Sequence, residues 1–161
     1  MEIEQFLKNS GISINEILNS ESSSTEETLK TARSFSETLE PGVFVLLTGE
    51  LGSGKTTFVR GIAERLECAG EVHSPSYKII NRYAGKSIIF HIDFYRLKKY
   101  EEVIGTGIED IFRENAVFAI EWPEIFIGYF RKFFLVDMEY NGEGKRRIKI
   151  FDCRRKKGQN E

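Results

Sequence analysis

Residues 43–57 read Val-Phe-Val-Leu-Leu-Thr-Gly-Glu-Leu-Gly-Ser-Gly-Lys-Thr-Thr, and this stretch decides the fold. Its first part, residues 43–48, is a short apolar run rich in β-forming residues, which is typical of a strand buried on both faces of a parallel sheet. Residues 49–56 then fit the pattern G-x-x-x-x-G-K-[ST] at every fixed position. From Lys55 to Leu66 apolar residues recur on one helical face. The order strand, glycine-rich turn, helix is the context that a phosphate-binding loop requires.

The residue types of this loop match the needs of a nucleotide. Glycines let the backbone fold so closely around an anion that several N–H groups and the positive helix end face one phosphate. Lys55 can place its charge between the β- and γ-phosphates, the Thr56 hydroxyl is positioned for Mg²⁺, and Thr57 can donate toward the α-phosphate. The remaining loop residues expected to contact ATP or ADP are Glu50, Leu51, Gly52, Ser53 and Gly54.

Two acidic residues close other apolar runs, and magnesium needs a carboxylate at the end of a neighbouring strand. Asp93 ends residues 88–93, and Glu121 ends residues 116–121. We favour Glu121 as the magnesium-side carboxylate because its run is the more uniformly apolar, and Asp93 as its partner near the γ-phosphate. His91 interrupts the other run, and we interpret it as a structural residue on the opposite face of the sheet from the neighbours of Asp93. The catalytic candidates are thus Lys55, Asp93 and Glu121, and the metal candidates are Thr56 and Glu121.

The rest of the chain predicts a single α/β domain of 161 residues. Residues 24–27 read as a capping box at a helix start. Glycine-containing turns at residues 84–86 and 141–144 predict two hairpins. The predicted fold is therefore a phosphate-loop NTPase-like mixed sheet, with a mostly parallel core, antiparallel hairpins and flanking helices. We divide the chain into a helical N-terminal extension (1–23), the ATPase domain (24–152) and a frayed basic tail (153–161).

Composition excludes several classes of protein. The formal net charge of −2 disfavours strong stand-alone nucleic-acid binding. The two cysteines and two histidines complete no zinc pattern. The chain has no signal-peptide pattern and no apolar run long enough to span a bilayer, so we expect a cytoplasmic protein with no membrane partner.

Several separate motifs, in order, resemble those of the bacterial TsaE (YjeE) family. They are Gly49 to Thr57, Ser74-Pro-Ser-Tyr77, His91-Ile-Asp-Phe-Tyr-Arg96 with Leu97, Gly107-Ile-Glu-Asp110 and Glu121-Trp-Pro-Glu124. The resemblance implies an ATPase that supports the proteins TsaB and TsaD in forming threonylcarbamoyladenosine at position 37 of tRNAs reading ANN codons. It also implies that Thr56 and Glu121 hold Mg²⁺, that Asp93 matters for hydrolysis, and that residues 74–77 form a switch-like loop.

The resemblance adds an adenine-side expectation and a set of partners. The segment before the first predicted helix, Ser23 to Thr25, and the turn at Gly144 and Lys145 would approach the adenine, with Lys145 where the family has Arg. TsaB and TsaD are the expected protein partners, and any tRNA contact would come through their complex.

Two alternatives stay open. A small-molecule kinase would share the phosphate loop, but no arginine-bearing lid or acceptor pocket can be placed in the sequence. A nucleotide-gated binding module would hold ATP as a signal and hydrolyse it little. Most GTPases are excluded, because the guanine-specifying Asn/Thr-Lys-x-Asp segment does not occur.

Overall fold

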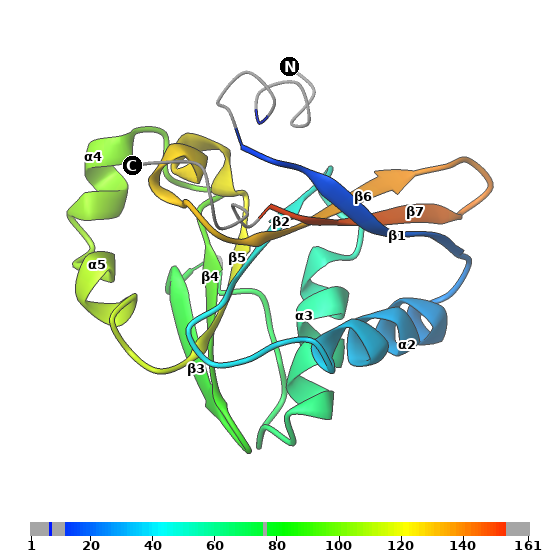
Figure 1. Ribbon diagram of the computed structural model, residues 1–161, viewed down its shortest axis with the longest axis horizontal. Coiled ribbons are helices and arrows are strands. Elements are labelled where there is room, and N and C mark those ends of the chain that lie inside the picture. Colours follow the sequence, from blue (N-terminus) through cyan, green and yellow to red (C-terminus); the bar gives the residue numbers. More distant parts are fainter. Residues whose placement is uncertain (1–6, 8–11, 76, 154–161) are drawn as a thin grey trace.

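The computed structural model describes residues 7, 12–75 and 77–153. Within them the strands form a seven-stranded mixed sheet in the order β1-β7-β6-β2-β5-β4-β3 (Figure 1). The strands are β1 (Asn15–Ser22), β2 (Phe44–Thr48), β3 (Ile80–Ala84), β4 (Ile88–Asp93), β5 (Val117–Glu121), β6 (Phe134–Tyr140) and β7 (Arg146–Asp152). The helices are α2 (Thr25–Ser36), α3 (Lys55–Arg65), α4 (Tyr100–Ile104), α5 (Ile108–Ile111) and the short 3-10 turns η1 (Pro123–Ile125) and η2 (Ile127–Tyr129).

The centre of the sheet is parallel and its flanks are antiparallel. β2 lies between β5 and β6 and is parallel to both, and β4 is parallel to β5. β3 pairs antiparallel with β4, and β7 pairs antiparallel with β6 and β1. The predicted α/β class and both predicted hairpins are confirmed.

Each face of the sheet buries its own hydrophobic core, because alternate residues of a strand point to opposite faces. Helices α2 and α3 pack side by side on one face, over Val45 and Leu47 of β2. The other face, which carries Leu46, is covered by α4, α5 and the segment of η1 and η2. The resulting three layers leave the carboxyl ends of β2, β4 and β5 together at one edge, beside the N-terminus of α3.

The helical expectation for the N-terminal extension is wrong for residues 15–22. This segment is β1, an edge strand paired along its length with β7, and Leu18 packs against the core under α2. The pairing needs β7 as a template far along the chain, so the mixed local sequence carried no sign of it. Residues 1–6 and 8–11 of the extension, and residues 154–161 of the tail, lie outside the described residues.

Two predicted element starts also changed in detail. The first strand of the hairpin around residues 84–86, which the apolar and aromatic residues from Tyr77 onward predict to start at Tyr77, begins only at Ile80, because the backbone N–H groups of Lys78 and Ile79 both donate to Pro75 O, at 2.8 and 2.6 Å, and close a turn. At the start of α2, Glu27 N donates to Ser24 Oγ at 3.1 Å as a capping box requires. The Glu27 carboxylate accepts from the backbone N–H of Ser23, one residue earlier than in the predicted box.

Candidate functional site

The phosphate loop joins β2 to α3, and its geometry depends on glycine. Gly49 has a φ of 131°, and a Cβ there would lie 2.1 Å from the carbonyl oxygen of Met138 on β6. Gly54 precedes α3 with a φ of 105°, in the left-handed region. No side chain caps the start of α3 and its first turn holds no acid, so the N–H groups of that turn remain for an anion. The loop is therefore built for close backbone contact with phosphate.

Lys55 lies folded back into this loop. Its Nζ donates to the carbonyl oxygens of Gly49 at 2.6 Å and Glu50 at 2.9 Å, and lies 4.1 Å from the centroid of the Trp122 ring. Burial lowers the pKa of Lys55, and the negative charges of Glu121, Glu124 and Asp93 oppose that shift. The ammonium group thus has weak backbone acceptors as partners and acidic side chains around it, which suits it to meet a phosphate.

The two candidate carboxylates stand side by side across the β4–β5 ladder, where Asp93 and Glu121 are register partners. The Thr56 hydroxyl donates to Glu121 Oε1 at 2.8 Å. Asp93 accepts from the Ser74 hydroxyl at 3.0 Å and from the backbone N–H of Tyr95 at 2.9 Å. Both acids are buried at 4% exposure, so each has fixed donors in place of water.

These groups meet in one pocket of about 460 Å³ at the carboxyl edge of the sheet. Its lining residues are Leu51, Gly52, Gly54, Lys55, Thr56, Thr57, Ser74, Tyr77, Asp93, Tyr95, Arg96, Glu121, Trp122 and Arg146. Glu124 adds charge nearby: burial raises the pKa of its carboxyl group, Lys55 opposes the rise, and Asp137 reinforces it. The structure thus joins the phosphate loop, a threonine hydroxyl and two strand-end carboxylates in a single cavity.

Residues 22–148 match the model of the family described as threonylcarbamoyl adenosine biosynthesis protein TsaE. The chain belongs to the TsaE family. A relative from Nostoc sp., a "tRNA threonylcarbamoyladenosine biosynthesis protein TsaE", is 36% identical over 80% of this chain and 83% of its own length. A protein of the same description from Haemophilus influenzae is 40% identical over 60% of this chain, and the match spans 65% of that relative. Among solved structures, the crystal structure of Bacillus subtilis YdiB has a TM-score of 0.75 at 26% identity and covers 88% of each chain.

The family is that of tRNA threonylcarbamoyladenosine biosynthesis proteins, and nucleotide binding is consistent with membership of it. The expected phosphate-side residues Lys55, Thr56 and Thr57 all line the pocket. Glu50 and Ser53 do not line the pocket, although Glu50 contributes the carbonyl oxygen that accepts from Lys55.

The adenine-side residues expected from the family pattern do not reach this pocket. Ser23, Thr25, Gly144 and Lys145 are exposed and are absent from the lining. Arg146, the residue after Lys145, lines the pocket instead and lies 5.8 Å from the Tyr140 ring. Gly144 and Lys145 belong to the exposed turn before β7, whereas Arg146 is the first residue of that strand.

His91 lies on the face opposite Ile92 and Phe94, the sequence neighbours of Asp93, but its contact with Glu121 was not expected, and neither was a role for Tyr140. His91 and Asp93 are two residues apart on β4 and therefore share a face, and His91 Nε2 lies 2.8 Å from Glu121 Oε1. The two-residue spacing was the available signal. Tyr140 donates its hydroxyl to the carbonyl oxygen of Gly52 at 2.7 Å, which ties the phosphate loop to the end of β6. That contact joins residues far apart in sequence, and nothing local indicates it.

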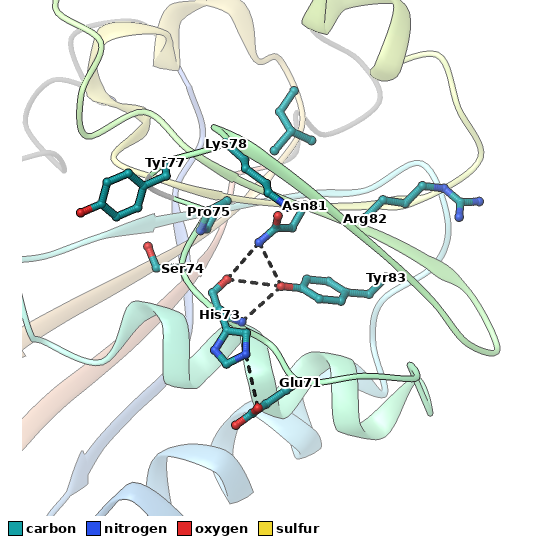
Figure 2. A pocket seen from close by; sticks show the side chains of 10 residues that line it. Glu71, His73, Ser74, Pro75, Tyr77, Lys78, Asn81, Arg82 and Tyr83 are labelled. Carbon is teal, nitrogen blue, oxygen red and sulfur yellow. Dashed lines mark hydrogen bonds and ion pairs between the residues drawn. The ribbon is translucent and has the colours of Figure 1, made fainter.

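A second pocket of about 610 Å³ lies beside β3, and Figure 2 shows its lining. In its lining the Tyr83 hydroxyl bonds to the backbone of His73, donating to the carbonyl oxygen and accepting from the N–H, both at 3.3 Å. Ser74 and Tyr77 belong to the linings of both pockets. The segment that carries them is therefore a common wall between the two cavities; Ser76 lies outside the described residues.

Within the described residues, no helix is both long and apolar enough to cross a membrane.

Proposed function

We propose that this chain is a Mg²⁺-dependent ATPase that supports TsaB and TsaD in forming N6-threonylcarbamoyladenosine at position 37 of tRNAs reading ANN codons. The relatives are described as proteins of this biosynthesis, which supports the process. The bond from Thr56 to Glu121, 2.8 Å long and next to a complete phosphate loop, carries the proposal of metal-dependent nucleotide chemistry. We place this work in the cytoplasm, where tRNA is available.

Backbone and side-chain groups contact different parts of the bound triphosphate. Backbone N–H groups at the start of α3 bind the β-phosphate, because no side chain caps them. Lys55 leaves the carbonyl oxygens of Gly49 and Glu50 and pairs with the β- and γ-phosphate oxygens. Asp93, held by Ser74 and by the N–H of Tyr95, orients the attacking water near the γ-phosphate.

The donors present fit a magnesium ion of the kind that nucleotides bring with them. No group of three or more His, Cys, Asp or Glu forms a metal cage in the described part of the chain. Magnesium bound with nucleotides needs only one or two protein oxygens, because phosphates and water supply the others. The Thr56 hydroxyl uses its proton on Glu121, which leaves its lone pairs for a cation. When bound, the ion would neutralise charge that develops on the phosphate oxygens.

The decisive experiment is reconstituted tRNA modification. TsaB, TsaD, tRNA and the threonylcarbamoyl donor are incubated with and without this chain, and modified nucleoside per transferase is followed over several turnovers. We expect repeated turnover only with the chain, ATP and Mg²⁺, and a loss of that effect with Lys55→Ala. Turnover that is equal without the chain contradicts the proposal. Support of turnover with a non-hydrolysable ATP analogue would favour the nucleotide-gated binding module instead.

A further inference from the structure

His91 is a buried polar residue whose place in the core calls for a reason. It lies on β4 with 0% exposure, on the same sheet face as Ile89, which is equally buried. An apolar side chain would satisfy that position, because burying an imidazole costs free energy unless its nitrogens find partners. Only one of the two ring nitrogens does so among the described residues: Nε2 lies 2.8 Å from Glu121 Oε1, whereas Nδ1 is buried without a hydrogen-bond partner.

The direction of this hydrogen bond follows from the acceptor. A carboxylate oxygen can only accept, so Nε2 must carry a proton and donate. A proton on Nδ1 would be a buried donor with no acceptor among the described residues, so the geometry favours the Nε2–H tautomer. Glu121 Oε1 then accepts two hydrogen bonds, from His91 Nε2 and from the Thr56 hydroxyl.

We infer that His91 is a positioning residue, which fixes the Glu121 carboxylate so that Oε1 faces Thr56. The inference rests on the proposed Mg²⁺-dependent function. The hydrogen bond from His91 restrains rotation of the Glu121 carboxylate. The Thr56 hydroxyl therefore keeps donating to Oε1, and its lone pairs stay available to the pocket. Outer partners of metal-side carboxylates act in this way, and their loss typically lowers metal affinity about 10- to 100-fold.

The tautomer of His91 can be tested without nucleotide or metal, in a chain that keeps the native residue at position 91. The chain has two histidines, and the His73→Gln variant leaves a single imidazole for nitrogen NMR. His73 is a suitable residue to remove because its ring is exposed and, among the described residues, pairs with the exposed Glu71 at 3.3 Å. We expect ring-nitrogen shifts of one Nε2–H tautomer with a hydrogen-bonded proton. An Nδ1–H tautomer overturns the inference.

The positioning role is tested by two substitutions whose side-chain amide groups differ in length. In His91→Gln the amide nitrogen stands at the ε position and can still donate to Glu121, whereas in His91→Asn it stops short. Nucleotide affinity is measured by calorimetry over a Mg²⁺ series and in EDTA, beside thermal unfolding and the His73→Gln control. In His91→Asn, we expect the Mg²⁺ concentration that gives half of the maximal gain in nucleotide affinity to rise about tenfold or more. The nucleotide affinity measured in EDTA should not change. His91→Gln should behave as the wild type does.

The outcomes separate this inference from the function on which it rests. If wild-type affinity does not respond to Mg²⁺, the proposed function itself fails. If the wild type responds and His91→Asn responds equally, the positioning role is wrong while the function stands. If His91→Gln and His91→Asn lose the response equally and both melt early, His91 serves packing alone and the inference is overturned.

Discussion

Lys55 and Trp122 form a residue pair that reports on the nucleotide. The Lys55 ammonium lies 4.1 Å from the ring centroid of Trp122, the only tryptophan of the chain. Phosphate oxygens are stronger partners for an ammonium than an aromatic face or backbone carbonyls. We therefore expect Mg-ATP to draw Lys55 away and to change the Trp122 emission, measured by fluorescence titration. An unchanged spectrum at saturating ATP, with binding confirmed by calorimetry, would contradict this.

The two carboxylates should differ in the step that they affect. Glu121 accepts from Thr56, so Glu121→Gln is expected to weaken the Mg²⁺ dependence of ADP and ATP binding. Asp93 touches Ser74 and the Tyr95 backbone, and Asp93→Asn should lower the rate of phosphate release about 10²- to 10⁴-fold, with a smaller effect on ADP affinity. Calorimetry and phosphate-release kinetics on both variants make the comparison. The reverse pattern would exchange their roles, and wild-type behaviour in both would remove them from the site.

At the scale of single elements, β1 is joined to α2 by a buried hydroxyl pair. Ser22 Oγ lies 2.7 Å from Thr28 Oγ1 and donates to Ser24 O at 2.9 Å. Ser22→Ala leaves buried polar groups with fewer partners and should lower the free energy of unfolding by about 1–3 kcal/mol. Ser20→Ala on the same strand is the control. Ser20 Oγ is buried with no hydrogen-bond partner among the described residues, so its removal loses no hydrogen bond and should not lower the free energy of unfolding. Equal losses in urea unfolding would mean that the pair does not join the elements.

The same elements show what sequence could and could not reveal. β2, the loop and α3 were predictable because apolar run, glycines and helical periodicity are all local and agree with one another. Asp93 and Glu121 were predictable as site residues because parallel strands end at one edge. β1 was not, since an exposed edge strand with mostly polar residues has no pattern of its own and gains its order from β7. The pocket position of Arg146 and the contact of His91 with Glu121 depend on which face each side chain takes. The two-residue spacing from Asp93 puts His91 on the face of that carboxylate.

For the molecule as a whole, Cys153 ties stability to pH. Burial, reinforced by the charge of Asp152, raises the pKa of the Cys153 thiol to about 12, above about 8.5 in an unfolded chain. Between these values the folded thiol keeps a proton that the unfolded one loses, so stability falls as pH rises above about 8.5. From about pH 8 to 10, the free energy of unfolding measured in urea should fall by about 1–2 kcal/mol more in the wild type than in Cys153→Ala. Parallel losses in the two proteins would contradict the shift.

The rate of ATP hydrolysis by this chain should depend on its protein partners. In the described residues the phosphate loop is complete, but Lys55 is held by Gly49 and Glu50, and the wall formed by Ser74 and Tyr77 faces a second, open cavity. A partner bound against that wall can favour the arrangement in which Lys55 and Asp93 both face the γ-phosphate, and a ligand shifts such a balance only by its preference for one state.

A preference of about 2 to 4 kcal/mol corresponds to roughly 30- to 1000-fold in rate. We expect slow phosphate release by the chain alone and a stimulation of that order by TsaB with TsaD, measured with saturating Mg-ATP. Tyr77 is 87% exposed and lies 4.2 Å from the guanidinium of Arg96. If the wall is the point of contact, Tyr77→Ala should lose most of the stimulation, whereas Tyr129→Ala, an exposed tyrosine outside both pockets, should keep it. Equal rates with and without the two partners would contradict coupling, and equal stimulation of both variants would place the contact on another surface.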